Sequence, residues 1–377
     1  MKRSITIILS LLMLGITKGQ ETTCKSLKDA FEPYFKIGVA IGDRRINDNR
    51  SRNLLLKEFN SIVAENCMKS ESLQRRKGVF DFSASDRFIE FGEAHNLHIV
   101  GHCLVWHSQA PHWFFVNEDG TPAHRDTLIN RLRNHIHTVV GRYKGKVKGW
   151  DVVNEAIEHD GSFRRSPLYN IIGEEFISLA FKFAHEADPE AELYYNDYGM
   201  DSPRKREAVV RLIEKLKTDG CRIDGVGMQS HLSFSTPLHE YEKSISAFAA
   251  TGVKVMVTEL DLSVLPWPTN IHGASVEQRA AYQERMNPYT KGLPKEIEKQ
   301  QTDFFKKLFD IYLRHSEHIT RITFWGLTDG DSWKNNWPTN GRTDYPLAFD
   351  RAFNAKPFVK EIIGLALERR SSNEQTR

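Results

Sequence analysis

The 377-residue sequence lacks the features that mark several common classes of protein. Its formal net charge is only +3, and its basic residues are interspersed with acids, so we expect no nucleic-acid partner. No glycine-rich turn follows the first predicted strand, which argues against a dinucleotide-binding fold. The four cysteines, at Cys24, Cys67, Cys103 and Cys221, follow no framework spacing, and we predict no essential disulfide.

Metal-ligand patterns are also missing, although the chain has 15 histidines. A barrel metalloenzyme commonly takes two histidines spaced two apart on one strand, so that both point the same way. The pair with that spacing, His135 and His137, lies in the helical pattern Leu128–Val140 instead. We therefore expect neither a metal ion nor a cofactor.

The first 19 residues read as a secretory signal peptide. Lys2 and Arg3 precede an apolar run from Ile5 to Ile16, and a small residue, Gly19, closes the segment. The run is too short for a membrane span, which needs about 20 apolar residues. A buried N-terminal helix is the alternative. We expect a secreted or periplasmic protein in which residues 20–368 form one catalytic domain and the polar residues 369–377 form a disordered tail.

Short β-branched apolar runs alternate with amphipathic segments along the whole chain. The predicted strands are Phe35–Ile41, Ser61–Asn66, His98–Trp106, Val147–Asn154, Ala191–Asn196, Gly225–His231, Lys254–Glu259 and Arg321–Trp325. The clearest predicted helices are Glu174–Ala187, Arg204–Lys217, His239–Ala250 and Glu296–Arg314. Eight strands that alternate with helices of this length predict an α/β fold, a single-domain (β/α)8 TIM barrel. A long segment, residues 263–295, follows the seventh strand and is expected to shape one side of the cleft.

Polar and aromatic residues collect at the ends of the predicted strands, and in a barrel these ends converge on one face. Two glutamates among them stand out, Glu155 after the fourth strand and Glu259 on the seventh. An ionised carboxylate at the end of an apolar strand is costly to bury without a partner or a task. Glycoside hydrolysis needs one protonated and one ionised carboxyl group across the bond that breaks. Two structural glutamates paired with arginines are the alternative.

The strand-end motifs resemble those of glycoside hydrolase family 10, whose usual activity is that of an endo-β-1,4-xylanase. The motifs in order are Ala64–Lys69, Gly101–Gln109, Trp150–Ala156, Asn196–Tyr198, Gly227–His231, Thr258–Asp261 and Phe324–Gly326. The resemblance covers about residues 30–365. It implies a retaining double displacement of xylan and xylo-oligosaccharides, with Glu155 as the acid/base and Glu259 as the nucleophile.

The resemblance also implies the residues that hold the sugar. Gln229 is the expected partner of Glu155, His231 is expected to hold Glu259, and Asn154 to bind the sugar 2-hydroxyl. The other expected substrate-binding residues are Glu65, Asn66, Lys69, His102, Trp106, Tyr198, Trp325 and Trp333. For His102 a purely structural hydrogen bond is a competing interpretation, and His107 should point elsewhere unless its strand has already ended.

Two other functions stay open at this point. A related barrel glycosidase, such as a cellulase or mannanase, would use the same pair of glutamates, and hydrolysis of carboxymethylcellulose would reveal it. A degenerate barrel would bind xylan without cleaving it, although such a protein has no need of both glutamates. We expect a monomer by default.

Overall fold

The computed structural model describes residues 25–267 and 284–375. The predicted signal peptide and Cys24 lie outside the described residues, and so does the middle of the 263–295 segment. The strands are β1 Lys36–Ile41, β2 Ser61–Ala64, β3 His98–Trp106, β4 Gly149–Asn154, β5 Glu192–Asp197, β6 Gly225–Met228, β7 His231–Ser233, β8 Lys254–Ser263 and β9 Ile319–Phe324.

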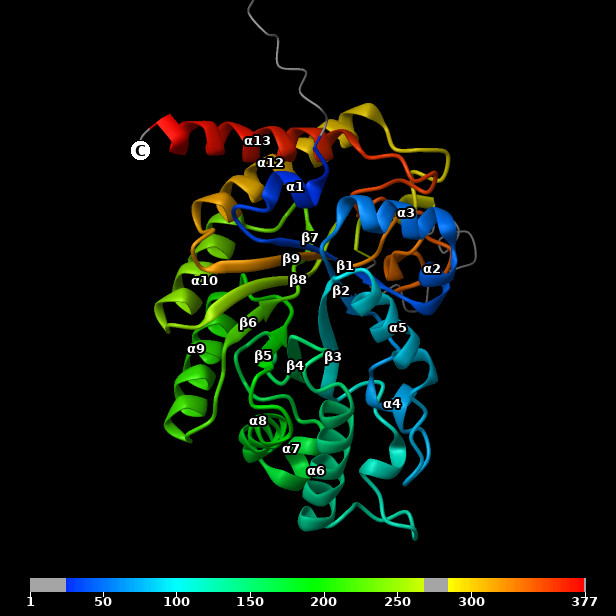
Figure 1. The fold of residues 1–377 in the computed structure, drawn as a ribbon, viewed down its shortest axis with the longest axis vertical. Coiled ribbons are helices and arrows are strands. Elements are labelled where there is room, and N and C mark those ends of the chain that lie inside the picture. The colour runs from blue at the N-terminus through cyan, green and yellow to red at the C-terminus, as the bar shows by residue number, and fades with distance from the viewer. Residues whose placement is uncertain (1–24, 268–283, 376–377) are drawn as a thin grey trace, which may run out of the picture.

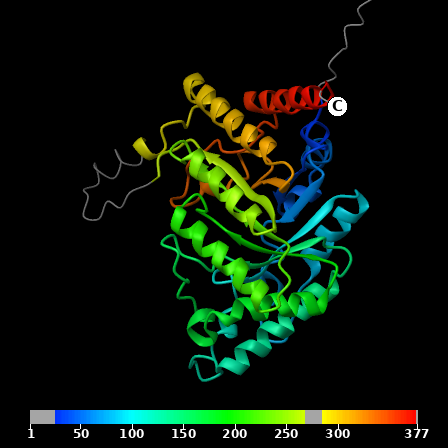
Figure 2. The same cartoon turned by 90° about the vertical axis from the view of Figure 1, so that its left-hand side faces the viewer.

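Eight of these strands form a closed parallel barrel (Figures 1 and 2). Each strand pairs with its sequence neighbour from β1 to β6, and β1 pairs with β9 on the other side. β6 pairs with β8 from Gly225 against Lys254 to Met228 against Val257, and this pairing closes the ring. The (β/α)8 barrel predicted from the sequence is therefore confirmed.

Helices surround the barrel on its outside (Figure 1). They are α1 Leu27–Phe31, α2 Asp43–Asn47, α3 Asn49–Glu58, α4 Ser70–Leu73, α5 Ser83–Ala94, α6 Arg125–Arg142, α7 Pro167–Ile172, α8 Glu175–Ala187, α9 Pro203–Thr218, α10 Leu238–Ala250, α12 Lys295–Arg314 and α13 Pro357–Gln375. Two 3-10 turns, His112–Phe114 and Trp333–Asn335, lie in loops. α13 packs on α12 and α1, so the last helix of the described chain lies beside the first (Figure 1).

Local sequence explains where the helices end. α8 ends before Asp188-Pro189, because proline disfavours a helical conformation in the residue before it. α9 begins at Pro203, because the N–H that proline lacks has no hydrogen-bond partner in the first turn of a helix. The helix ends before Gly220, which takes the left-handed conformation, with a φ of 71°, that often follows a helix.

The bounds of the predicted strands agree with the structure to within two residues, except in two strands. The predicted strand Gly225–His231 is divided into β6 and β7, because Ser230 takes a φ of 64° between them. β8 does not end at Glu259 but continues to Ser263, because β7 pairs with this extension, with His231 opposite Asp261.

The end of the chain also differs from the prediction, which placed a disordered tail at residues 369–377. α13 continues to Gln375, and residues 376–377 lie outside the described residues. An ion pair four residues apart, between Arg370 and Glu374, supports this last part of the helix. The hydroxyl of Ser371 also donates to the carbonyl of Leu367.

Two separate apolar clusters fill the molecule. The larger cluster lies between the strands and the helices. The smaller one draws residues from β1, β2, β3, β5, β8 and the end of β9 and fills the inside of the barrel. Its members are Ala40, Val63, Val100, Tyr194, Met256 and Trp325. The barrel is thus a packed core and leaves no channel for substrate, so substrate must bind at its rim.

In the described ranges, no helix is both long and apolar enough to traverse a bilayer. Cys67, Cys103 and Cys221 are free thiols. Burial raises the pKa of Cys67 to about 12, so its thiol is protonated near neutral pH.

Close packing between β3 and β4 generates the first prediction. A Cβ added to Gly101 would lie 2.1 Å from Cε3 of the fully buried Trp150. Gly101→Ala should therefore lower the free energy of unfolding by about 3 kcal/mol, the upper end of the usual cost of overpacking. Urea unfolding would measure the change. Gly141→Ala, in α6 with open space around it, is the matched control and should stabilise the protein by about 0.5–1 kcal/mol. Equal stability of the two variants would contradict the packing argument.

Candidate active site

Glu155 follows the last residue of β4 and has a left-handed backbone, with a φ of 58°. Such a conformation is uncommon for any residue other than glycine, so the surroundings must hold it in place. Its N–H donates to the carbonyl of Asn196 on β5 at 2.9 Å. Its carbonyl accepts from Nε of Arg164 at 2.8 Å. These two bonds fix the backbone from which the carboxylate projects.

Neutral groups surround the Glu155 carboxylate. It accepts hydrogen bonds from Nε1 of Trp106 at 2.9 Å, Nε2 of Gln229 at 3.0 Å and Nδ2 of Asn154 at 3.3 Å. Nδ1 of His107 lies 4.0 Å away, because β3 ends at Trp106 and the next residue is free to turn toward the site. Burial, helped by Arg164, lowers the pKa of His107, so this ring is neutral near pH 7.

Glu259 has a cationic partner. Its carboxylate is nearly buried and accepts from Nδ2 of Asn196 at 2.9 Å and from Nε2 of His231 at 3.2 Å. The other ring nitrogen of His231 contacts Asp261 at 2.9 Å, so the ring lies between two carboxylates. Burial by itself would lower the pKa of His231, but Asp261 and then Glu259 raise it to about 9. His231 is therefore an imidazolium that donates to both carboxylates near neutral pH.

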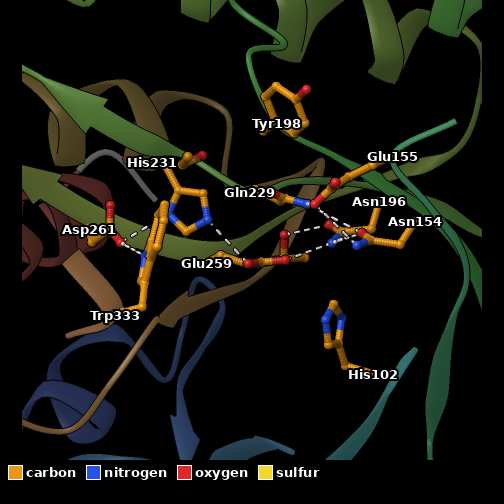
Figure 3. Close-up of polar contacts among 12 residues, drawn as sticks. His102, Asn154, Glu155, Asn196, Tyr198, Gln229, His231, Glu259, Asp261 and Trp333 are labelled. Atoms are coloured by element: carbon orange, nitrogen blue, oxygen red, sulfur yellow. Dashed lines mark hydrogen bonds and ion pairs between the residues drawn. The ribbon is translucent and has the colours of Figure 1, made fainter. Parts of the chain in front are cut away.

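Amide side chains connect the two glutamates (Figure 3). Oδ1 of Asn154 accepts from Nδ2 of Asn196 at 2.9 Å and from Nε2 of Gln229 at 3.2 Å. Asn196 also reaches Glu259, and Gln229 also reaches Glu155. The network thus holds both carboxylates in one arrangement before any substrate binds, which is the condition for electrostatic preorganisation.

Asp261 anchors the side of the site on which Glu259 lies. It is fully buried on β8, two residues after Glu259, and contacts His231, Nε1 of Trp333 at 3.0 Å and Nζ of Lys334 at 3.3 Å. Burial would raise the pKa of this carboxyl, but His231 and Lys334 hold it below its usual value. Asp261 therefore stays ionised and keeps His231 charged.

The polar residues after β2 lie beside Trp106. Nζ of Lys69 donates to Oδ1 of Asn66 at 3.0 Å and to Oε1 of Gln109 at 2.8 Å, and it lies 4.9 Å from the centre of the Trp106 ring. Burial raises the pKa of Glu65, while Lys69 opposes that shift. This cluster offers a cation and several hydrogen-bonding groups next to the ring that contacts Glu155, as a bound hydroxyl-rich ligand requires.

Three aromatic residues predicted for the site lie around its edge. His102 contacts Asp151 through Nδ1 at 2.9 Å, and its ring stands edge-on to Trp325 with their centres 5.2 Å apart. The Asp151 contact gives His102 the structural hydrogen bond that we kept as an alternative. Tyr198 lies apart from the amide network (Figure 3), and its hydroxyl accepts from Nη2 of Arg164 at 2.8 Å.

Several contacting residues were not among the predicted site residues. Asn196 and Asp261 do lie in strand-end motifs, so their position was a usable signal. Arg164 and Lys334 come from loops, where no periodicity marks them. In the described part of the chain, no group of three or more histidine, cysteine or acidic side chains has an arrangement suited to a metal ion.

Comparison with known proteins places this site in a family. The model of glycosyl hydrolase family 10 matches residues 26–364. The endo-1,4-β-xylanase A of Xylanibacter ruminicola is 48% identical over 97% of this chain and 100% of its own length. The β-1,4-xylanase of Dictyoglomus thermophilum is 39% identical over 96% of this chain and 98% of its own.

Solved structures give the same result. A family 10 endoxylanase retrieved from a sugarcane soil metagenome superposes with a TM-score of 0.85 at 43% identity. The match covers 90% of this chain and 100% of that one.

The charged state of His231 predicts how stability depends on pH. Because its pKa is raised from 6.5 to about 9 in the folded protein, its stabilisation is complete below pH 6.5 and is lost as the pH rises through 9. The wild type should exceed His231→Gln in free energy of unfolding at pH 6, and the difference should shrink steadily toward pH 9.5. Chemical denaturation across that range would measure it.

His137→Gln serves as the control for that series. His137 pairs with Glu186 at the surface, where an ion pair contributes little. Its difference from the wild type should stay within roughly 0.5 kcal/mol at every pH. A stability difference for His231→Gln that does not change with pH would contradict the charged His231.

Proposed function

The chain belongs to glycosyl hydrolase family 10, and we propose that it cleaves internal β-1,4 bonds of xylan with Glu155 as the acid/base and Glu259 as the nucleophile. It is a retaining glycoside hydrolase, so the reaction proceeds through a covalent glycosyl-enzyme. One observation supports the assignment of roles more than any other. Glu259 contacts an imidazolium, whereas the hydrogen-bond donors to the Glu155 carboxylate are uncharged.

This difference in surroundings matches the two tasks. A nucleophile must be ionised, and the Glu259 carboxylate contacts the positive charge of His231 and the amide of Asn196. An acid must be able to carry a proton, and the groups that donate to the Glu155 carboxylate, from Trp106, Asn154 and Gln229, are all uncharged.

The reaction then runs in two steps. Glu155 protonates the glycosidic oxygen while Glu259 attacks the anomeric carbon, which releases one part of the chain and leaves the other bound to Glu259. Glu155, now ionised, removes a proton from water, which attacks the same carbon and frees Glu259. Asn154 donates to Glu155 and is linked to Glu259 through Asn196, a suitable place to bind the sugar 2-hydroxyl as the positive charge develops on the ring.

Glutamine substitutions test the two roles separately. Glu259→Gln should lose essentially all turnover on any xyloside, because no covalent intermediate can form. Glu155→Gln should lower kcat on xylan by about 10²–10⁴, the usual contribution of acid/base catalysis. With a nitrophenyl xylobioside, whose leaving group needs no proton, Glu155→Gln should still release a rapid burst of nitrophenol.

Glu93→Gln is the control, because Glu93 pairs with Lys146 on the surface and should not affect the rate. The first products from xylan should be β-anomers by NMR, as retention requires. α-Anomers, or a burst from Glu259→Gln but none from Glu155→Gln, would overturn the assignment. Hydrolysis of carboxymethylcellulose at a rate equal to that of xylan would overturn the substrate.

We also propose that the protein acts outside the cytoplasm, either secreted or in the periplasm. The proposal rests on the charged, apolar and small segments of residues 1–19. Expression in a bacterium with a secretion pathway should give a mature chain that begins close to Gln20. N-terminal sequencing measures this, and a mature chain that still begins at Met1 would contradict it.

A further inference from the structure

Two tryptophans are unusually exposed. Trp267, after β8, and Trp337, after β9, each leave 58% of their surface open to solvent. Among the described residues, the other large apolar side chain that is similarly exposed is Val79, at 47%, in the loop after α4. Large aromatic rings normally bury most of their surface, and rings exposed together mark a binding surface.

The two tryptophans project from loops that one arginine holds together. Nη2 of the buried Arg342 donates to the carbonyl of Pro266, directly before Trp267, at 2.8 Å. Its Nη1 donates to the carbonyl of Trp337 at 3.5 Å. Asp344 fixes the same loop, because it accepts from the backbone N–H of Val264 at 3.1 Å. The two indoles therefore extend from adjacent and well-anchored backbone.

The Trp267 ring lies close to residues of the active site, and Arg342 holds the backbone of Trp337 beside that of Trp267. Nζ of Lys334 lies 5.9 Å from the centre of the Trp267 ring and 4.7 Å from that of Trp333. Trp333 in turn donates from Nε1 to Asp261, and the centre of its ring lies 5.0 Å from the centre of the His231 ring, which contacts Glu259. Figure 3 shows the Trp333 ring beside Asp261 and His231, on the side of the network away from Glu155.

We propose that Trp267 and Trp337 form an additional sugar-binding surface, which holds units of the xylan chain beyond those next to the catalytic glutamates. The proposal rests on the proposed function. A β-1,4-linked chain presents flat C–H faces that stack on aromatic rings, and xylose carries no charge that would require an ion pair. Trp267 shares Lys334 with Trp333, which lies beside His231, so a xylan chain that extends from the glutamates beyond Trp333 is the occupant that this position favours.

Substrate length separates this surface from the catalytic centre. Trp267→Ala, Trp337→Ala and the double variant should raise KM for xylohexaose, with about a tenfold loss of kcat/KM in the double variant, if the lost contact is worth about 1.4 kcal/mol. For a nitrophenyl xylobioside, which is too short to reach the indoles, kcat/KM should stay within about twofold of the wild type. The melting temperature should hardly change, because both rings are mostly in solvent.

Matched variants make the result specific. The double Phe variant keeps flat rings and should retain most of the activity on xylohexaose, whereas Val79→Ala, an exposed apolar residue elsewhere, should match the wild type on both substrates. Equal losses on the long and the short substrate would overturn the proposal, because the rings would then support the catalytic loops. Unchanged kinetics on xylohexaose would also overturn it.

Two further outcomes have separate meanings. A wild-type dimer that the double Ala variant converts to a monomer, in size-exclusion chromatography, would show that a second copy of the chain covers the rings and would overturn the proposal. A wild-type protein that fails to hydrolyse xylan would refute the proposed function instead. Calorimetric binding of xylohexaose to the wild type and to the double Ala variant would then still decide the role of the indoles, with equal affinities counting against it.

Discussion

The pairing of β6 with β8 closes the barrel, and the geometry of the active site depends on this closure. The residues that follow β6 reach both glutamates: Gln229 contacts Glu155, and His231, which begins β7, contacts Glu259. Without the pairing, the edge of β6 would be open and nothing would fix its distance from β8. The closing hydrogen bonds therefore do more than complete a sheet, since they set the position of one carboxylate relative to the other.

The same closure concentrates charge on one side of the site. Glu259, Asp261, His231 and Lys334 lie together with little exposure, two anions against two cations. Buried charges are tolerated when each has a partner, and the removal of one partner leaves an uncompensated charge. Glu155 lies outside this cluster among neutral amides and an indole. Two chemically identical side chains thus have different neighbours, an imidazolium beside Glu259 and uncharged donors around Glu155, and a two-step displacement gives them different roles.

The sequence predicted the barrel because buried parallel strands appear as uninterrupted apolar runs, and eight such runs can be counted directly. It predicted the catalytic face because strand ends in a barrel meet. Strand limits were less accurate where they depend on distant partners, as in the extension of β8 that pairs with β7. Arg164, which fixes the backbone of Glu155, has no periodic or motif signal in its loop. The left-handed backbone of Glu155 was equally invisible, because it results from bonds to Asn196 and Arg164 rather than from its own preference.

Asp261 contacts both the partner of Glu259 and a residue expected to bind the substrate. Its carboxylate keeps His231 charged and also receives the indole N–H of Trp333, while Lys334, its other cation, lies near the ring of Trp267. A xylan chain that stacks on Trp333 and Trp267 therefore lies on residues that are linked to Asp261, and Asp261 in turn keeps His231 charged beside Glu259. Because the cluster is buried and every charge in it is paired, it resists displacement by the substrate. Binding energy gained at these tryptophans can thus position the sugar against Glu259, because it is not spent on rearranging the protein.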